Sequence, residues 1–173
     1  MSDLYLLRHA KAAPQRPDGD RERPLAPAGR RDAQALAAWI AERRLVPALV
    51  LCSPALRARQ TLDIIAPAFA APPRIVAEDG LYLAAAAQLL KRLNALPAEL
   101  ASVMLIGHNP GLHELASVIA DAASGPLAAR LGAGLPTAAL ALFEVAVDWP
   151  ALAPRCARLA ELIAPQDLAR RPL

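Results

Sequence analysis

Two histidines and two arginines in this 173-residue sequence have the types and surroundings that phosphoryl chemistry requires. Arg8 and His9 are adjacent near the N-terminus, Arg57 follows a Ser-Pro pair, and His108 lies in a Gly-His-Asn-Pro-Gly run. A neutral imidazole nitrogen is a nucleophile that needs no separate base, and flanking arginines favour that neutral form. The planar guanidinium group matches phosphate oxygens bidentately. The four residues therefore predict in-line phosphoryl transfer to a histidine, with arginines stabilising the non-bridging oxygens.

The elements that must bring these residues together are short apolar runs that alternate with helical patterns. Apolar runs bounded by turn or polar signals predict strands, and apolar positions that repeat at helical spacing predict helices. Pro27 suits a first helical position, Pro67 predicts a break, and Asn109 before Pro110 is typical of a helix N-cap. The predicted strands are 4–7, 49–52, 74–77, 103–106, 139–147 and 157–163, and the predicted helices are 27–43, 54–69, 86–96 and 109–123.

This alternation predicts an α/β fold, a three-layer α/β/α sandwich around a mainly parallel sheet. We expect a single domain over residues 1–165, because no internal repeat or linker interrupts it, and a loose C-terminal tail over 166–173. Ligands of such folds bind beyond the carboxyl ends of the strands. The segments 8–9, 53–57 and 107–111 each follow a predicted strand, so we expect them at one edge of the sheet. There the helix that begins near residue 109 would add backbone N–H groups for an anion.

The composition argues against several other classes of protein. A net charge of +3 without a clustered basic stripe argues against a nucleic-acid partner. The longest uncharged apolar stretch, 131–143, is too short to span a membrane, and the N-terminus does not resemble a signal peptide. We therefore expect a cytoplasmic protein with no membrane partner. Cys52 and Cys156 have neither metal nor disulfide spacing, and His113 and Glu114 do not complete a zinc-helix pattern. We expect no metal and no cofactor.

The same residues resemble the motifs of the histidine phosphatase (phosphoglycerate mutase-like) superfamily. Arg8-His9 is similar to its RHG-type motif, although Ala10 stands where the wider superfamily often has Gly. Ser53-Pro54-x-x-Arg57-x-x-Gln60-Thr61 resembles the second motif, and Gly107-His108-Asn109 resembles the third. Within the superfamily the likeness is greatest to the small SixA-type phosphohistidine phosphatases. The features shared with them are Arg-His-Ala-Lys-Ala at 8–12, Arg23-Pro24-Leu25 followed by Gly29, Leu81-Tyr82 and Leu135-Pro136-Thr137.

The resemblance implies a role for each of the residues singled out above. His9 becomes the nucleophile that forms a covalent phosphohistidine, and Arg8 and Arg57 become phosphate ligands. His108 becomes the second histidine, which binds the phosphoryl oxygens, and Asn109 joins the substrate-binding residues.

Three further residues have weaker assignments. Arg23 would complete the anion pocket, unless Arg21-Glu22-Arg23 is an ordinary solvated loop. The mutase branch of the superfamily uses a glutamate as general acid between its second and third motifs. Glu78 and Asp79 lie in that region, but no surrounding motif distinguishes either one from an ordinary loop acid.

The leading functional hypothesis is a metal-independent phosphatase that hydrolyses phosphohistidine on a protein of the histidine phosphotransfer type, with a role in signal transduction. The short distance from Thr61 to Gly107 leaves little chain for a lid, so we expect an open pocket and a phosphorylated protein domain as partner. The P–N bond is labile and its leaving nitrogen is easily protonated, so this reaction depends less on a general acid than ester hydrolysis does. A phosphatase or mutase for small phosphoesters is the alternative enzyme. A non-catalytic phosphate-binding regulatory module is the alternative of another class, which the presence of both histidines and both arginines disfavours.

Overall fold

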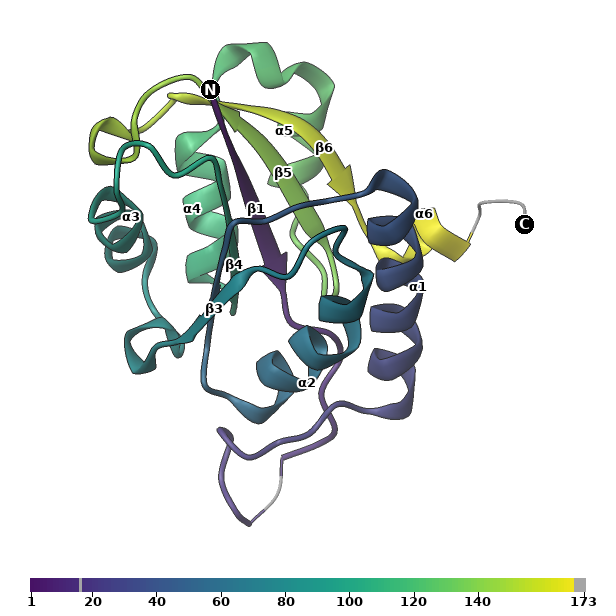
Figure 1. The fold of residues 1–173 in the computed structure, drawn as a ribbon. Helices are drawn as coiled ribbons and strands as arrows, with labels where there is room; N and C mark the ends of the chain where they lie inside the picture. The colour runs from purple at the N-terminus through teal and green to yellow at the C-terminus, as the bar shows by residue number, and fades with distance from the viewer. Residues whose placement is uncertain (16, 170–173) are drawn as a thin grey trace.

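The computed structural model describes residues 1–15 and 17–169 and contains a six-stranded mixed sheet (Figure 1). Its strands are β1 (Ser2–Arg8), β2 (Leu49–Cys52), β3 (Arg74–Ala77), β4 (Ser102–Gly107), β5 (Leu140–Val145) and β6 (Ala157–Ile163). They lie in the order β3-β2-β4-β1-β5-β6. The first four strands of this order are parallel, whereas β5 pairs antiparallel with both β1 and β6. The sheet is therefore mainly parallel, as predicted, with antiparallel pairing at one edge.

Helices cover both faces of this sheet and complete the three layers (Figure 1). One face is covered by α1 (Pro27–Arg43), α2 (Leu56–Ile65) and α6 (Pro165–Ala169). The other face is covered by α3 (Ala86–Asn94), α4 (Gly111–Ile119) and α5 (Gly125–Gly132). Short 3-10 turns occupy 66–68, 79–81, 122–124 and 149–151. The predicted α/β/α sandwich is confirmed.

The sheet separates two hydrophobic cores, because successive side chains of a strand point to opposite faces. Leu7 of β1 packs with Leu36 and Ile40 of α1, whereas Leu4 and Leu6 belong to the core under α3, α4 and α5. Every residue of β4 is buried, as expected for a central parallel strand covered on both faces. The two cores hold the carboxyl ends of the central strands in fixed positions relative to one another.

Most predicted elements are confirmed, with differences at their ends. The predicted helix 54–69 becomes α2, which ends at Ile65 before a 3-10 turn that contains Pro67. The predicted helix 109–123 becomes α4, which begins at Gly111, and its N-cap is Pro110 rather than Asn109. The Asn109 side chain instead donates through Nδ2 to the carbonyl oxygen of Leu135. The strand predicted over 139–147 is shorter and covers 140–145.

Two helices lie where the sequence pattern predicts none. The helix α5 follows a turn in which the Asp121 carboxylate accepts the N–H of Ser124, and Gly125 then takes a φ of +51°, which glycine adopts readily. The helix α6 begins at Pro165 and extends into the expected tail over 166–173. Its Asp167 accepts the N–H of Ala164, and Leu168 packs against the core beside α1. The expectation of a loose tail is therefore wrong for 166–169, and 170–173 lie outside the described residues.

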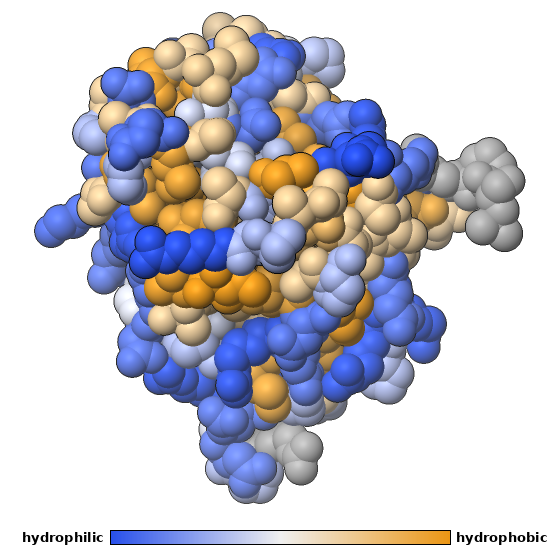
Figure 2. All heavy atoms as spheres, in the orientation of Figure 1, coloured by the Kyte–Doolittle hydropathy of each residue, from blue (hydrophilic) through white to orange (hydrophobic). Residues whose placement is uncertain are grey.

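Hydrophilic residues gather on the loop between β1 and α1 and on the outer side of α1 (Figure 2). This loop leaves the carboxyl end of β1, so its polar side chains begin at the edge of the sheet where the candidate residues are expected. Among the residues that the structure describes, no helix is long and apolar enough to cross a membrane.

Candidate active site

The carboxyl ends of β1, β2 and β4 lie side by side and bring the two histidines together. Arg8 of β1 pairs in register with Gly107 of β4, and Cys52 of β2 pairs with Ile106. His9 and His108 are therefore the next residues of two neighbouring strands, and their ring centroids are 5.0 Å apart. A cavity of about 500 Å³ opens at this edge. It is lined by Arg8, His9, Lys11, Ala12, Asp20, Arg23, Arg57, Leu83, His108, Asn109 and Thr137.

The hydrogen bonds of His9 define which ring nitrogen carries its proton. Nδ1 lies 2.7 Å from the carbonyl oxygen of Ala10, and because a carbonyl only accepts, Nδ1 is the donor. Nε2 accepts a hydrogen bond of 3.2 Å from Nε of Arg57 and so presents its lone pair. Burial lowers the pKa of His9 to about 4; the bond to Ala10 opposes this effect, and the positive charges of Arg57 and Arg8 add to it. His9 is therefore a neutral imidazole near pH 7 with Nε2 directed at the arginine.

His108 is buried beside His9 and has a comparable environment. Its Nε2 lies 2.6 Å from Oγ of Ser53, and its Nδ1 accepts a hydrogen bond of 3.3 Å from Nη2 of Arg57. Burial, with smaller contributions from His9 and Arg57, lowers the pKa of His108 to about 3. Ser53 follows β2 and belongs to the second motif. Its hydrogen bond therefore holds His108, a residue of the third motif, in place. The two imidazoles are both neutral and are bridged by one guanidinium group.

Arg57 is the most deeply buried cation of the cavity, with 3% of its surface exposed. It occupies the first turn of α2. Its Nε and Nη2 donate to the two histidines, and its Nη1 and Nη2 donate to Asp20, at the carbonyl oxygen (2.7 Å) and at Oδ2 (2.9 Å). Arg57 thus provides a fixed positive charge next to both ring nitrogens where a phosphoryl group would bind.

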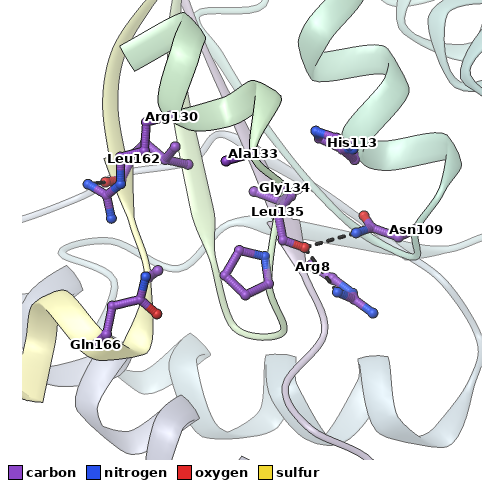
Figure 3. A pocket seen from close by; sticks show the side chains of 11 residues that line it. Arg8, Asn109, His113, Arg130, Ala133, Gly134, Leu135, Leu162 and Gln166 are labelled. Carbon is purple, nitrogen blue, oxygen red and sulfur yellow. Dashed lines mark hydrogen bonds between the residues drawn. The ribbon is translucent and has the colours of Figure 1, made fainter. Parts of the chain in front are cut away.

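Arg8 lies across the cavity from α2 and is half-buried. Its Nη1 donates to the carbonyl oxygen of Leu135 (3.0 Å), which also accepts from the side-chain amide of Asn109 (2.9 Å), as Figure 3 shows. Within residues 1–15 and 17–169, the buried Nε of Arg8 and the buried Oδ1 of Asn109 have no hydrogen-bond partner. The backbone carbonyl of Leu135 therefore fixes the side chains of both Arg8 and Asn109, and in this way the segment 135–137 helps to shape the site.

A second cavity of about 450 Å³ adjoins the first and shares Arg8 and Asn109 with it (Figure 3). Two polar side chains that line it, His113 and Arg130, bind backbone carbonyl groups. His113 contacts the carbonyl oxygen of Leu131 (2.7 Å), and Arg130 donates to the carbonyl oxygen of Leu162 (3.0 Å).

The structure brings Arg23 to the cavity but leaves both candidate acids outside its lining. Arg23 donates to the carbonyl oxygen of Ala13 and to Oδ1 of Asp20, so it is not an ordinary solvated loop residue. Two hydrogen bonds join the Glu78 carboxylate to Arg92, and Asp79 pairs with Arg21. Neither carboxyl lines the cavity that contains His9.

Sequence reasoning did not identify two residues of this site, Asp20 and Tyr82. The Tyr82 hydroxyl donates to Oδ2 of Asp20 (2.6 Å), and the tyrosine ring packs edge-on against His108 at 5.5 Å between centroids. Asp20 lies in a polar loop with no apolar periodicity, so hydrophobic periodicity cannot predict its place. The one available signal was its spacing of three residues from Arg23, which matches an observed ion pair.

Two glycines allow the surrounding loops to approach closely. A Cβ at Gly29 of α1 would lie 2.1 Å from the carbonyl oxygen of Lys11, and a Cβ at Gly111 of α4 would lie 1.9 Å from that of Ala84. Only glycine permits these contacts. They hold the chain that follows His9 and the chain that follows Tyr82 against the two helices.

The second motif also ties these segments to α2. The Gln60 side chain accepts the N–H of Leu25 (2.8 Å), and the Thr61 hydroxyl accepts the N–H of Ala10 (3.0 Å). Both polar residues therefore hold the loop between β1 and α1 in place.

Comparison with known proteins agrees with this geometry. Residues 4–81 match the histidine phosphatase superfamily (branch 1). An uncharacterized protein of Mycobacterium tuberculosis is 37% identical over 159 residues, which are 88% of this chain and 96% of that protein. A candidate SixA phosphohistidine phosphatase from Agrobacterium tumefaciens has 36% identity and a TM-score of 0.78, covering 94% of this chain and 97% of that one. A second candidate SixA protein, from Nakamurella multipartitia, has 28% identity and a TM-score of 0.77, with 95% and 96% covered.

The matched segment begins in β1 and includes the first two motifs, and the structural likeness extends over nearly the whole chain. On sequence, fold and the pairing of two histidines with arginines, the chain belongs to the histidine phosphatase superfamily, has the phosphoglycerate mutase-like fold and is similar to SixA-type proteins.

Proposed function

We propose that this protein hydrolyses phosphohistidine on a partner protein, without a metal, through a covalent phosphohistidine at His9. The observation that carries this proposal is the set of hydrogen-bond partners of the two ring nitrogens of His9. Its Nδ1–H is bound to the Ala10 carbonyl, which leaves a lone pair on a buried Nε2 beside Arg57. A nucleophile held in its reactive form needs no base to activate it.

The reaction divides into two displacements at phosphorus. In the first, the Nε2 lone pair of His9 forms a bond to phosphorus, the bond to the leaving imidazole breaks, and that imidazole takes up a proton. In the second, water forms a bond to phosphorus, the bond to Nε2 breaks, and inorganic phosphate and a proton are released. Arg8, Arg23 and Arg57 stabilise the charge on the phosphoryl oxygens in both steps.

His108 would bind a phosphoryl oxygen through Nδ1, which then needs a proton. Ser53 makes this possible, because a hydroxyl can either accept from Nε2 or donate to it. The proton of a neutral His108 can therefore reside on either ring nitrogen, and His108 can donate to the substrate without changing its charge.

Three features support phosphohistidine over a small phosphoester. Glu78 and Asp79 lie outside the cavity, and the P–N bond is the one that depends least on a general acid. The rim of the cavity is open, with Leu83 55% exposed and Lys11 exposed beside it. The related Agrobacterium protein, at 36% identity, is described as a candidate phosphohistidine phosphatase.

The substrate proposal is tested by comparing kcat/KM for a phosphorylated histidine phosphotransfer domain with kcat/KM for phosphoglycerate and a sugar phosphate. We expect a clear preference for the protein substrate, and no turnover of either kind by His9→Ala. A preference for the small esters would overturn the substrate assignment and leave the His9 mechanism standing. Binding without turnover of any donor would instead support a regulatory module.

A further inference from the structure

Asp20, in the loop between β1 and α1, makes several polar contacts in the cavity, and the proposed reaction gives it no role. Its Oδ1 accepts from Nη1 of Arg23 (2.8 Å), and its Oδ2 accepts from Nη2 of Arg57 (2.9 Å) and from the Tyr82 hydroxyl (2.6 Å). Its carbonyl oxygen accepts from Nη1 of Arg57 (2.7 Å). A carboxylate bound to two of the cations that would receive the phosphoryl group requires an explanation.

The contacts of Arg57 divide between two edges of its guanidinium group. The edge formed by Nε and Nη2 faces the catalytic nitrogens, at 3.2 Å from Nε2 of His9 and 3.3 Å from Nδ1 of His108. The edge formed by Nη1 and Nη2 faces Asp20. Because the group is planar and rigid, fixing the second edge fixes the direction of the first.

Asp20 is itself held firmly enough to act as an anchor. Arg23 donates to it from one side and Tyr82 from the other, and the first N–H of α2, that of Leu56, donates to the carbonyl oxygen of Arg21 (2.9 Å). The hydrogen bonds from Tyr82, Arg23 and Arg57 hold the pKa of the Asp20 carboxyl well below its usual range. Asp20 therefore stays ionised near pH 7 and carries no proton to give to a leaving group.

We propose that Asp20 is a positioning residue, which holds Arg57 so that its Nε–Nη2 edge points at the phosphoryl group between His9 and His108. This inference rests on the proposed phosphoryl transfer at His9 but not on the identity of the leaving group. Two other roles make different predictions. A carboxylate that competes with the substrate for Arg57 would weaken binding of the anion, and a general acid would matter most for poor leaving groups.

The test compares Asp20→Ala and Asp20→Asn with Glu22→Gln, a change at an exposed acid of the same loop. Turnover is measured on aryl phosphates whose leaving groups differ widely in pKa, and vanadate affinity is measured by calorimetry. We expect D20A to lower kcat about ten- to a hundredfold, equally for every leaving group, and to weaken vanadate binding about tenfold. D20N keeps one acceptor oxygen and should lie between wild type and D20A, and E22Q should match wild type. Unchanged kcat, tighter vanadate binding, or a loss that disappears with the best leaving group would each overturn the proposal.

A double-mutant cycle with Arg57→Ala separates positioning from a general effect on the fold. If Asp20 acts through Arg57, D20A should cost less than about twofold in the R57A background. Equal losses in both backgrounds would overturn the proposal, and D20N provides the same cycle if D20A fails to fold. Vanadate affinity needs no turnover, so the positioning role is tested even if wild type hydrolyses none of the donors. That last result would count against the proposed function alone.

Discussion

The cavity around His9 has two sides that the chain builds in different ways. One side consists of residues at the ends of strands, His9, Ser53 and His108, and the register of a buried parallel sheet fixes their positions. The other side consists of Asp20 and Arg23 in a polar loop, held mainly by hydrogen bonds between side chains and to the backbone. The first side provides the reacting nitrogens, and the second provides charge and orientation. We infer that the rigid strand side carries out the bond-forming chemistry, whereas the loop orients the groups that bind the phosphoryl oxygens.

The largest effect should follow from removing the nucleophile on the strand side. We expect His9→Ala to lower turnover by about a thousandfold or more, because His9 is the residue proposed to accept the phosphoryl group. Brief mixing of wild type with a radiolabelled donor should trap an acid-labile, alkali-stable phosphoenzyme. A label that survives acid, or that appears equally in H9A, would contradict a covalent phosphohistidine at this position.

The comparison is sharpened by two arginines: Arg57 of α2, which donates to both histidines of the strand side, and Arg23 of the loop. The Arg57 side chain is 4% exposed, whereas the Arg23 side chain is 26% exposed and donates to the carbonyl oxygen of Ala13 and to Asp20. Losing one donor to transition-state charge typically costs about 3 kcal/mol, or about a hundredfold in rate. We therefore expect Arg57→Ala to lower kcat about a hundredfold and Arg23→Ala about tenfold or less. If R23A is the more damaging change, the loop contributes more to catalysis than the strand side.

The stability of the protein should depend on pH through the two buried histidines. Their pKa values are about 4 for His9 and about 3 for His108, against an ordinary value of 6.5, so the unfolded chain binds more protons below pH 6.5. The stability that the neutral rings contribute is present above pH 6.5 and is lost as pH falls through 6.5 towards the folded values. For His9 the loss is on the order of 3 kcal/mol in the free energy of unfolding. Urea unfolding between pH 7.5 and 4.5 measures this loss. His9→Gln should make the curve flatter, and an unchanged curve would show that the ring is not buried in its neutral form.

The smallest expected effect is that of metal removal. The arginines would neutralise the phosphoryl charge, and His108 would donate a hydrogen bond to a phosphoryl oxygen, so EDTA should change kcat by less than about twofold. Vanadate, which can take the trigonal bipyramidal shape of the transition state, should inhibit. Loss of turnover in EDTA that is restored by a divalent ion would contradict the proposed metal-independent mechanism.

The sequence by itself determined the strand side of the site. Apolar runs indicated the strands that end at Arg8, Cys52 and Gly107, and the parallel arrangement of those strands follows from their alternation with helices. The carboxyl ends of adjacent parallel strands share one edge of the sheet. The segments 8–9, 53–57 and 107–111, which are far apart in the chain, could therefore be placed together.

Only the tertiary structure decided the rest. The N-cap of α4, the helix α6 and the place of Asp20 depend on bonds to partners outside the local sequence pattern, such as Asn109 to Leu135 and Asp20 to Tyr82. It also decided where the candidate acid Glu78 lies, because Glu78 pairs with Arg92, a contact that local sequence signals do not specify. Periodicity reports how a segment packs against a core, and a polar side chain in a loop has no such period. Its position is set by the nearest group of complementary charge, which the folded chain alone brings within reach.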